Sequence, residues 1–115
     1  RYSREAFNLM NVQFGDGFKD AVIANVVSNE DNVKQVVTKV QLGEADAGIV
    51  YTSDAVAAPE LPTVEIPTGI NVIAEYPIAP LLASENADLA QAFIDYVLSG
   101  EGQSILQKWG FSPKP

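Results

Sequence analysis

Apolar residues recur along this chain at helical spacing in some segments and in short continuous runs in others. The clearest helical stripe consists of four valines at i, i+3, i+4 and i+7, namely Val33, Val36, Val37 and Val40. Further helices are expected at 3–14, 18–24, 52–58, 89–97 and 105–109. Ser3 is a candidate cap for the first of these, and Gly100 is expected to end the helix at 89–97.

The short apolar runs between the helices predict strands. Brief strands are expected at 26–27, 47–51 and 63–66, and the second of them has the continuous apolar character of a buried parallel strand. Residues 70–82 should be extended near a sheet edge or in a crossover, because Pro77 and Pro80 cannot donate to a strand ladder. Helices that alternate with strands in this way predict an α/β fold.

Composition narrows the chemistry that the chain can perform. The 115 residues are 47% hydrophobic, enough to bury a core, and they contain neither cysteine nor histidine. Disulfides, Ser–His and Cys–His catalytic arrangements and nearly all zinc sites are therefore excluded. Acidic residues outnumber basic ones 15 to 7, for a net charge of −8, which argues against nucleic-acid binding driven by bulk charge.

Three places in the sequence could carry chemistry. Glu44 and Asp46 would share a face of an extended segment and could act as an acid/base or metal-binding pair, although solvated carboxylates are more common. The helix that starts at Val33 offers unpaired backbone N–H groups to an anion, unless ordinary capping satisfies them. Tyr51 ends an apolar strand where α/β proteins bind ligands, or else is a core ring with a wet hydroxyl. No glycine-rich nucleotide motif supports an enzyme.

The segment 43–55, Gly-Glu-Ala-Asp-Ala-Gly-Ile-Val-Tyr-Thr-Ser-Asp-Ala, resembles the periplasmic molybdate-binding proteins, the substrate-binding subunits of molybdate/tungstate ABC importers. Segments 2–6, 30–33, 75–79 and 93–111 resemble the same family in matching order. The similarity covers essentially the whole chain. The block 48–54 is fairly specific, although relatives that bind other oxyanions share parts of it.

The resemblance implies a two-lobed, type II periplasmic-binding fold in proteins about twice as long, so that this chain would be a C-terminal fragment. Residues 1–72 would form most of the second lobe, incomplete at its N-terminus, and residues 73–115 would supply the crossover strand and C-terminal helices of the first lobe. In the family, donors to the oxyanion include three segments that would precede Arg1. Two that carry over are the backbone N–H of Val33 and the hydroxyl of Tyr51.

The function implied is capture of molybdate or tungstate by neutral hydrogen-bond donors and delivery to the permease subunits of an ABC transporter. No turnover, cofactor, metal-ligating side chain or nucleic-acid partner is expected. The location would be periplasmic or otherwise extracytoplasmic, with a lipid anchor as one option, and the fragment alone is expected to self-associate. Two other classes stay open: the effector domain of a transcriptional regulator with the same architecture, and an acid/base enzyme that uses Glu44 and Asp46.

Overall fold

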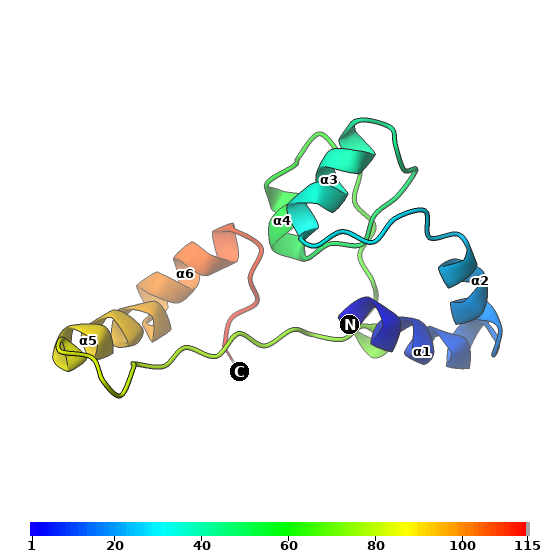
Figure 1. Cartoon of the computed structure of the whole chain (residues 1–115). Coiled ribbons are helices and arrows are strands. Elements are labelled where there is room, and N and C mark those ends of the chain that lie inside the picture. Colours follow the sequence, from blue (N-terminus) through cyan, green and yellow to red (C-terminus); the bar gives the residue numbers. More distant parts are fainter. Residues whose placement is uncertain (115) are drawn as a thin grey trace.

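The computed structural model describes residues 1–114 and contains only helices as regular elements (Figure 1). In chain order these are α1 (Tyr2–Phe14), α2 (Phe18–Ala24), α3 (Val33–Gln41), α4 (Thr52–Val56), the 3-10 helix η1 (Thr68–Ile70), α5 (Ala87–Leu98) and α6 (Gly100–Lys108). Each α-helix predicted from the sequence is present, and the boundaries differ by a few residues. None of the helices in residues 1–114 has the length and apolar character needed to cross a membrane.

Caps and glycines explain where several helices begin and end. The side chain of Asn32 accepts a hydrogen bond from Gln35 N at 3.1 Å and so caps α3. Gly43, with φ of 72°, follows α3 in the left-handed conformation that glycine tolerates best. Two expectations were wrong. Arg1, without a side-chain cap, takes the N-cap position of α1 instead of Ser3, and Ser99 rather than Gly100 ends α5.

The predicted strands are absent from the described residues, so the α/β architecture is not confirmed there. Segments 26–27, 47–51, 63–66 and 70–82 contain no β-structure, and only Ile70, the last residue of the 3-10 helix η1, belongs to a regular element. The physical reason is that a strand exists only where backbone donors and acceptors find a neighbouring strand, and these segments do not pair with one another. Their apolar side chains remain accessible, as Val27 (77% exposed) and Val64 (92% exposed) show.

The core is small and lies at the N-terminal end of the chain. The buried side chains Ala6, Phe7 and Met10 of α1 pack against partly buried apolar residues of α2 and of the segment around η1. Those neighbours are Phe18, Val22, Ile23, Ile66, Ile70 and Val72. Residues 1–72 thus hold the only cluster of buried side chains found in residues 1–114.

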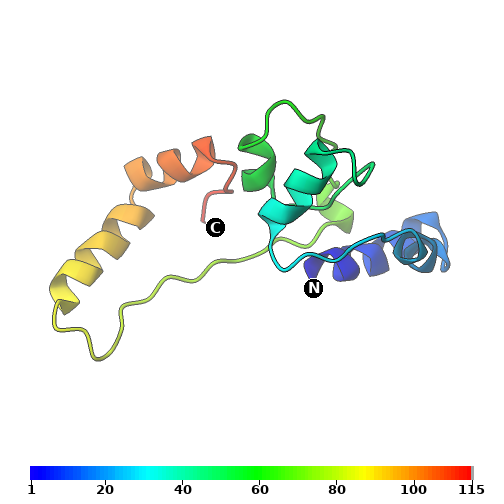
Figure 2. The same cartoon turned by 45° about the horizontal axis from the view of Figure 1, so that its top comes forward.

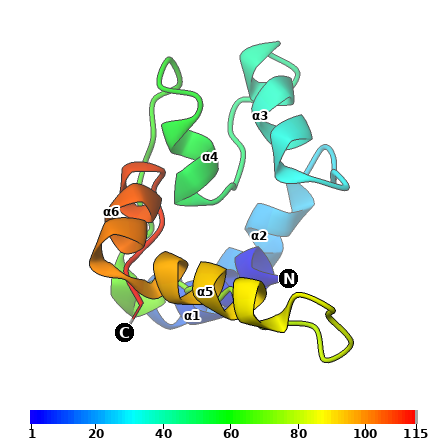
Figure 3. The same cartoon turned by 90° about the vertical axis from the view of Figure 1, so that its left-hand side faces the viewer.

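The C-terminal helices stand apart from this core. An extended strap, residues 71–82, leaves the region of η1 and leads away to α5, and Figures 1 and 2 show α5 and α6 well separated from α1 and α2. The chain is correspondingly elongated, with extents of 51 × 33 × 27 Å and a radius of gyration of 17.7 Å. Seen from the side in Figure 3, α5 and α6 meet at an angle around Ser99, which is the C-cap of one helix and the N-cap of the next.

The valine stripe of α3 packs against the segment that leads to Tyr51. All four valines are half-buried. A Cβ atom at Gly48 would lie 2.6 Å from Val36 Cγ1 and 3.2 Å from Val40 Cγ2, so only glycine lets the 47–51 backbone approach α3 this closely. The predicted packing face of α3 is therefore confirmed, although the segment against it is not a strand.

Replacing Gly48 by alanine should destabilise this packing. The new methyl group would overlap Val36 Cγ1, and overpacking of this kind typically costs about 1–3 kcal/mol of unfolding free energy. Urea unfolding followed by circular dichroism would measure the loss. Gly69→Ala is the matched control, because a Cβ atom at Gly69 meets nothing within 4 Å. Equal stability of the two variants would contradict the close approach.

Candidate functional site

The N-terminal end of α3 offers free backbone donors. Asn32 caps the helix through Gln35 N, and within residues 1–114 the N–H groups of Val33 and Lys34 have no protein acceptor. Unpaired N–H groups at the start of a nine-residue helix carry a positive partial charge. Capping by Asn32 and a free N–H group at Val33 therefore occur together here, whereas they were alternatives in the interpretation of the sequence.

One basic side chain of this helix, Lys39, is paired with two carboxylates. Lys39 Nζ lies 3.1 Å from a carboxylate oxygen of Glu30 and 3.7 Å from one of Glu44. Hydrogen bonds from Ser28 and then from Lys39 lower the pKa of Glu30, while the Glu30 carboxylate raises the pKa of Lys39. This ammonium group is therefore already paired with carboxylates and is not a free cation for an anion at the start of α3.

Tyr51 occupies the N-cap position of α4. Its backbone N–H donates to Asp54 Oδ2 at 3.1 Å, and its carbonyl accepts from Asp54 N at 3.0 Å. These two bonds fix the backbone from which the Tyr51 side chain projects, and the residue keeps 37% of its surface exposed. The hydroxyl is thus carried on an anchored backbone and does not belong to a buried core ring.

Two aromatic residues from distant parts of the sequence surround Tyr51. The rings of Tyr51 and Tyr76 meet edge to face with centroids 6.1 Å apart, and Tyr76 meets Phe111 in the same way at 6.1 Å. Tyr76 lies on the strap, and Phe111 follows α6. We call Tyr51, Tyr76 and Phe111 the aromatic trio. Of these three residues only Tyr51 is a site residue predicted from the sequence, because no local pattern indicates that the other two rings converge on it.

Gly110 brings the end of the chain onto α4. With φ of 81°, it places its backbone so that a Cβ atom would lie 2.9 Å from the carbonyl carbon and oxygen of Thr52. Thr52 is the residue after Tyr51, so the turn at Gly110 abuts the first turn of α4. The helices predicted at the C-terminus therefore return the chain to the neighbourhood of Tyr51.

The two predicted oxyanion donors lie at the starts of neighbouring helices. Val33 is the first residue of α3, Tyr51 immediately precedes α4, and these helices are adjacent in Figure 1. The other pair predicted from the sequence is Glu44 and Asp46, the candidate acid/base or metal-binding pair. Glu44 is engaged with Lys39, and in the described part of the chain no group of three or more acidic side chains could hold a metal ion.

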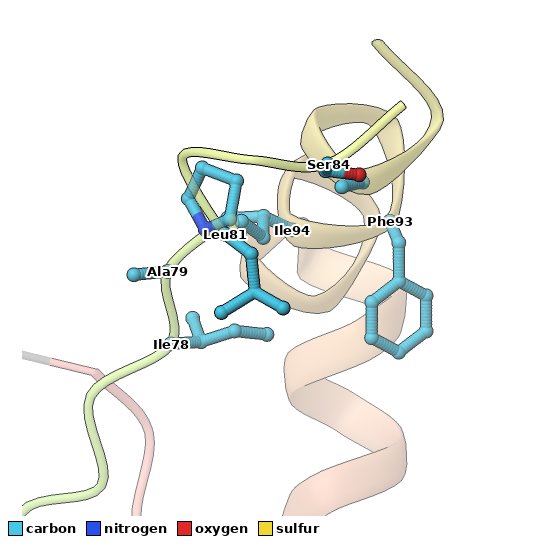
Figure 4. Close-up of a pocket in the computed structure, with 8 residues that line it drawn as sticks. Ile78, Ala79, Leu81, Ser84, Phe93 and Ile94 are labelled. Carbon is cyan, nitrogen blue, oxygen red and sulfur yellow. The ribbon is translucent and has the colours of Figure 1, made fainter. Parts of the chain in front are cut away.

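An apolar groove of about 310 Å³ lies between the strap and α5 (Figure 4). Ile78 and Leu81 of the strap face Phe93 and Ile94 of α5, and Ser84 contributes a polar side chain to the lining. Because hydrocarbon dominates the lining, the groove offers little to a small dianion. On α5 the side chain of Ile94 is buried, whereas Leu89, Phe93 and Tyr96 are left largely accessible.

Comparison with known proteins gives one consistent family. Residues 1–112 match the family described as bacterial extracellular solute-binding protein. The molybdate-binding protein ModA of Mycobacterium tuberculosis is 39% identical over 89 residues, which cover 76% of this chain and 34% of that protein. ModA of Escherichia coli is 32% identical over 114 residues, covering 98% of this chain and 41% of that protein.

A third relative, the ModA protein of Haemophilus influenzae, is 29% identical over 115 residues, which cover 99% of this chain and 42% of the relative. The chain thus spans about two fifths or less of the length of each of these relatives. No solved structure matches it significantly. The family match nevertheless extends over nearly all of the sequence, in agreement with the resemblance seen in its motifs. We conclude that the chain belongs to the family of bacterial extracellular solute-binding proteins.

Proposed function

We propose that this chain is the C-terminal part of the substrate-binding component of a molybdate or tungstate ABC transporter. The observation that carries the proposal is the pair of uncharged donors, Val33 N–H without a protein acceptor in residues 1–114 and the accessible Tyr51 hydroxyl, on neighbouring helices of a solute-binding family member. Relatives from three bacteria bear the name molybdate-binding protein, which supports molybdate as the ligand.

The proposal includes the lobe assignment and the α/β, type II periplasmic-binding fold. Residues 1–72 would contribute most of the second lobe, and residues 73–115 the crossover and the C-terminal helices of the first. All members of the buried cluster lie within residues 1–72, and the extended strap follows them. Both observations support a boundary between the two lobes at this point of the chain. The unpaired extended segments would gain strand partners from the rest of the longer protein, in the way that any strand requires.

Neutral donors suit a tetrahedral dianion. Helix-terminal N–H groups and hydroxyls stabilise negative charge in a closed cleft, where water no longer competes with them. A site built only from donors rejects protonated anions, because their O–H groups would face other donors. Cleft size would then select molybdate and tungstate over the smaller sulfate. The net charge of −8 and the paired Lys39 agree with binding that does not rely on basic side chains.

In this proposal the protein binds and releases its ligand without turnover, works in the periplasm or another extracytoplasmic location, and delivers the anion to the permease subunits. The family description, extracellular solute-binding, supports that location. No observation on the described residues favours a transcriptional regulator or an acid/base enzyme.

Replacing Tyr51 by phenylalanine in the full-length protein should weaken molybdate binding about tenfold or more. A hydrogen bond to a charged group is worth about 1.5–3 kcal/mol, and the change removes one such donor while it keeps the ring. Isothermal titration calorimetry with sodium molybdate measures the effect. Tyr96→Phe makes the same chemical change on α5, outside the aromatic trio, and should leave affinity unaltered. Unchanged affinity of the Tyr51 variant would remove this hydroxyl from the site.

A further inference from the structure

The loop that leads into α3 is not held in place by its own backbone. Residues 27–31 lie between α2 and α3 (Figure 1), and within residues 1–114 their N–H and C=O groups make no hydrogen bond to any other backbone group. Apolar contacts are also few, since Val27 is 77% exposed. A segment with so few contacts keeps one conformation only if its side chains restrain it.

Lys39, in the last turn of α3, supplies such a restraint. Its Nζ atom lies 3.1 Å from a carboxylate oxygen of Glu30 and 3.4 Å from Ser28 Oγ. The Ser28 hydroxyl donates to the same Glu30 oxygen, so that two side chains of the loop and one of the helix contact one another. We call Ser28, Glu30 and Lys39 the Lys39 cluster.

The Lys39 cluster is better sheltered from water than an ordinary surface ion pair. The side chains of Glu30 and Lys39 are 16% and 35% exposed, whereas those of Arg1 and Glu5, which pair on α1, are 82% and 42% exposed. Isolated exposed pairs contribute little because water screens them, and networks of several groups contribute more. Lys39 also lies 3.7 Å from Glu44, so one ammonium group contacts the segments on both sides of α3.

The position of the loop matters because the N–H group of Val33 belongs to the peptide unit that joins the loop to the helix. A peptide unit is planar, so the direction of this N–H group follows the orientation of the whole unit between Asn32 and Val33. Asn32 is extended, with φ of −145° and ψ of 156°. Rotation of the unit would require the loop to move, and the Lys39 cluster restrains the loop only two residues before Asn32.

We propose that Glu30 and Lys39 are positioning residues for the donor at Val33: their ion pair holds the loop against α3 and thereby keeps the Asn32–Val33 peptide oriented for the oxyanion. The inference rests on the proposed function of the Val33 N–H group as an oxyanion donor. In this arrangement the two charged side chains act through the peptide and do not contact the ligand. A donor that is already oriented binds at a lower entropic cost.

Removing the Glu30 carboxylate separates positioning from simple electrostatics, because the two predict opposite signs. Loss of a negative charge near the site would by itself favour an anion. Positioning predicts that Glu30→Ala in the full-length protein weakens molybdate binding about three- to tenfold, the factor that follows if the peptide is correctly oriented only about a third to a tenth of the time. Isothermal titration calorimetry with sodium molybdate measures the change.

Asp31→Ala is the matched control for this variant. It removes a carboxylate from the adjacent residue, and Asp31 makes no ion pair within residues 1–114. The two variants therefore change the net charge equally and differ in whether the Lys39 cluster is lost. Binding by the Asp31 variant should be unchanged or slightly tighter.

Variants of Lys39 test the same pair from the helix. Lys39→Met should weaken binding as much as Glu30→Ala does. In the Glu30→Ala background its effect should be less than about twofold, because only the longer contact with Glu44 remains to be lost. Lys39→Arg keeps a cation that can donate to the Glu30 carboxylate, so its affinity should stay within about twofold of the unmodified protein.

Two measurements separate positioning from a general structural role. Backbone order parameters from NMR relaxation of the ligand-free protein should fall at residues 28–31 of the Glu30→Ala variant, from about 0.85 to below about 0.6, and stay unchanged within α3. Urea unfolding should give similar free energies for all variants. A structural role would instead lower the unfolding free energy and loosen α3 as well.

Weaker binding by Glu30→Ala and Lys39→Met, with Asp31→Ala and Lys39→Arg unaffected, supports positioning. Unchanged or tighter binding by Glu30→Ala, an equal loss in Asp31→Ala, or loosening of α3 overturns it. Those results leave the proposed function intact, because molybdate binding by the full-length protein and its dependence on Tyr51 are measured separately. If the full-length protein does not bind molybdate, the proposed function fails and the inference fails with it.

Discussion

The isolated 115-residue chain should bind molybdate roughly a thousandfold more weakly than the full-length protein. In the longer protein that we propose, the resemblance to molybdate-binding proteins implies three further donor segments before Arg1. Each hydrogen bond to a charged group is worth about 1.5–3 kcal/mol. Their combined loss exceeds about 4 kcal/mol, and every 1.4 kcal/mol is about tenfold in affinity. In the isolated chain, Tyr51 and the start of α3 also remain open to water, which screens the remaining donors.

Calorimetry of both proteins in one buffer would measure this difference, with sodium sulfate as a control for nonspecific anion binding. Micromolar or tighter binding of molybdate by the 115-residue chain would contradict the expected loss. It would mean that residues 1–115 hold a complete site, and the lobe assignment would have to be revised.

The isolated chain should also self-associate. Apolar side chains line the outside of the strap and α5, where Leu82 is fully exposed and the exposed fractions are 80% at Leu81, 71% at Leu89 and 61% at Phe93. Burial of apolar surface is worth roughly 25 cal/mol per Å², so a contact of a few hundred Å² supplies several kcal/mol. The unpaired backbone of the strap adds an edge that a second copy could use.

Light scattering over a range of concentrations would detect the association. Replacing both Leu89 and Phe93 by lysine should restore a mass near 12.3 kDa. Val12→Lys is the control, because Val12 is 90% exposed but lies on α1, away from this surface. A monomeric mass for the unmodified chain at every concentration, with a protease-resistant C-terminus, would rule out association.

Helices were predictable from this sequence because their determinants are local. The valine spacing of α3, its Asn32 cap and the glycine after it act within about a dozen residues, and all appear in the structure. The end of α5 was misplaced by one residue, because the sequence does not reveal that Ser99 caps the next helix through Gly102 N. This error and the one at Ser3 concern which of two residues, one or two positions apart, takes a cap position.

Strands and the site depend on partners that are distant in sequence. The segment 47–51 has the apolar character of a buried strand, but it lies beside the valines of α3 without a strand neighbour, so its β-propensity alone produces no ladder. Val33 and Tyr51 were identified through the resemblance, and spacing alone favoured ordinary capping and a core ring. Tyr76 could not be predicted as a neighbour of Tyr51, because that contact depends on the path of the strap.

The turn at Gly110 has a practical consequence for anyone who maps this protein by deletion or by fusion. Gly110 and Phe111 are far from Tyr51 in sequence, yet the backbone of the first rests on Thr52 and the ring of the second supports Tyr76. A stop codon at position 110, or an affinity tag fused a few residues beyond it, would thus perturb the candidate site from a distant part of the gene. In a series of truncated proteins, such a change would have the same effect as a mutation in the ligand-binding site. An affinity tag fused near Gly110 is therefore better attached through a flexible linker.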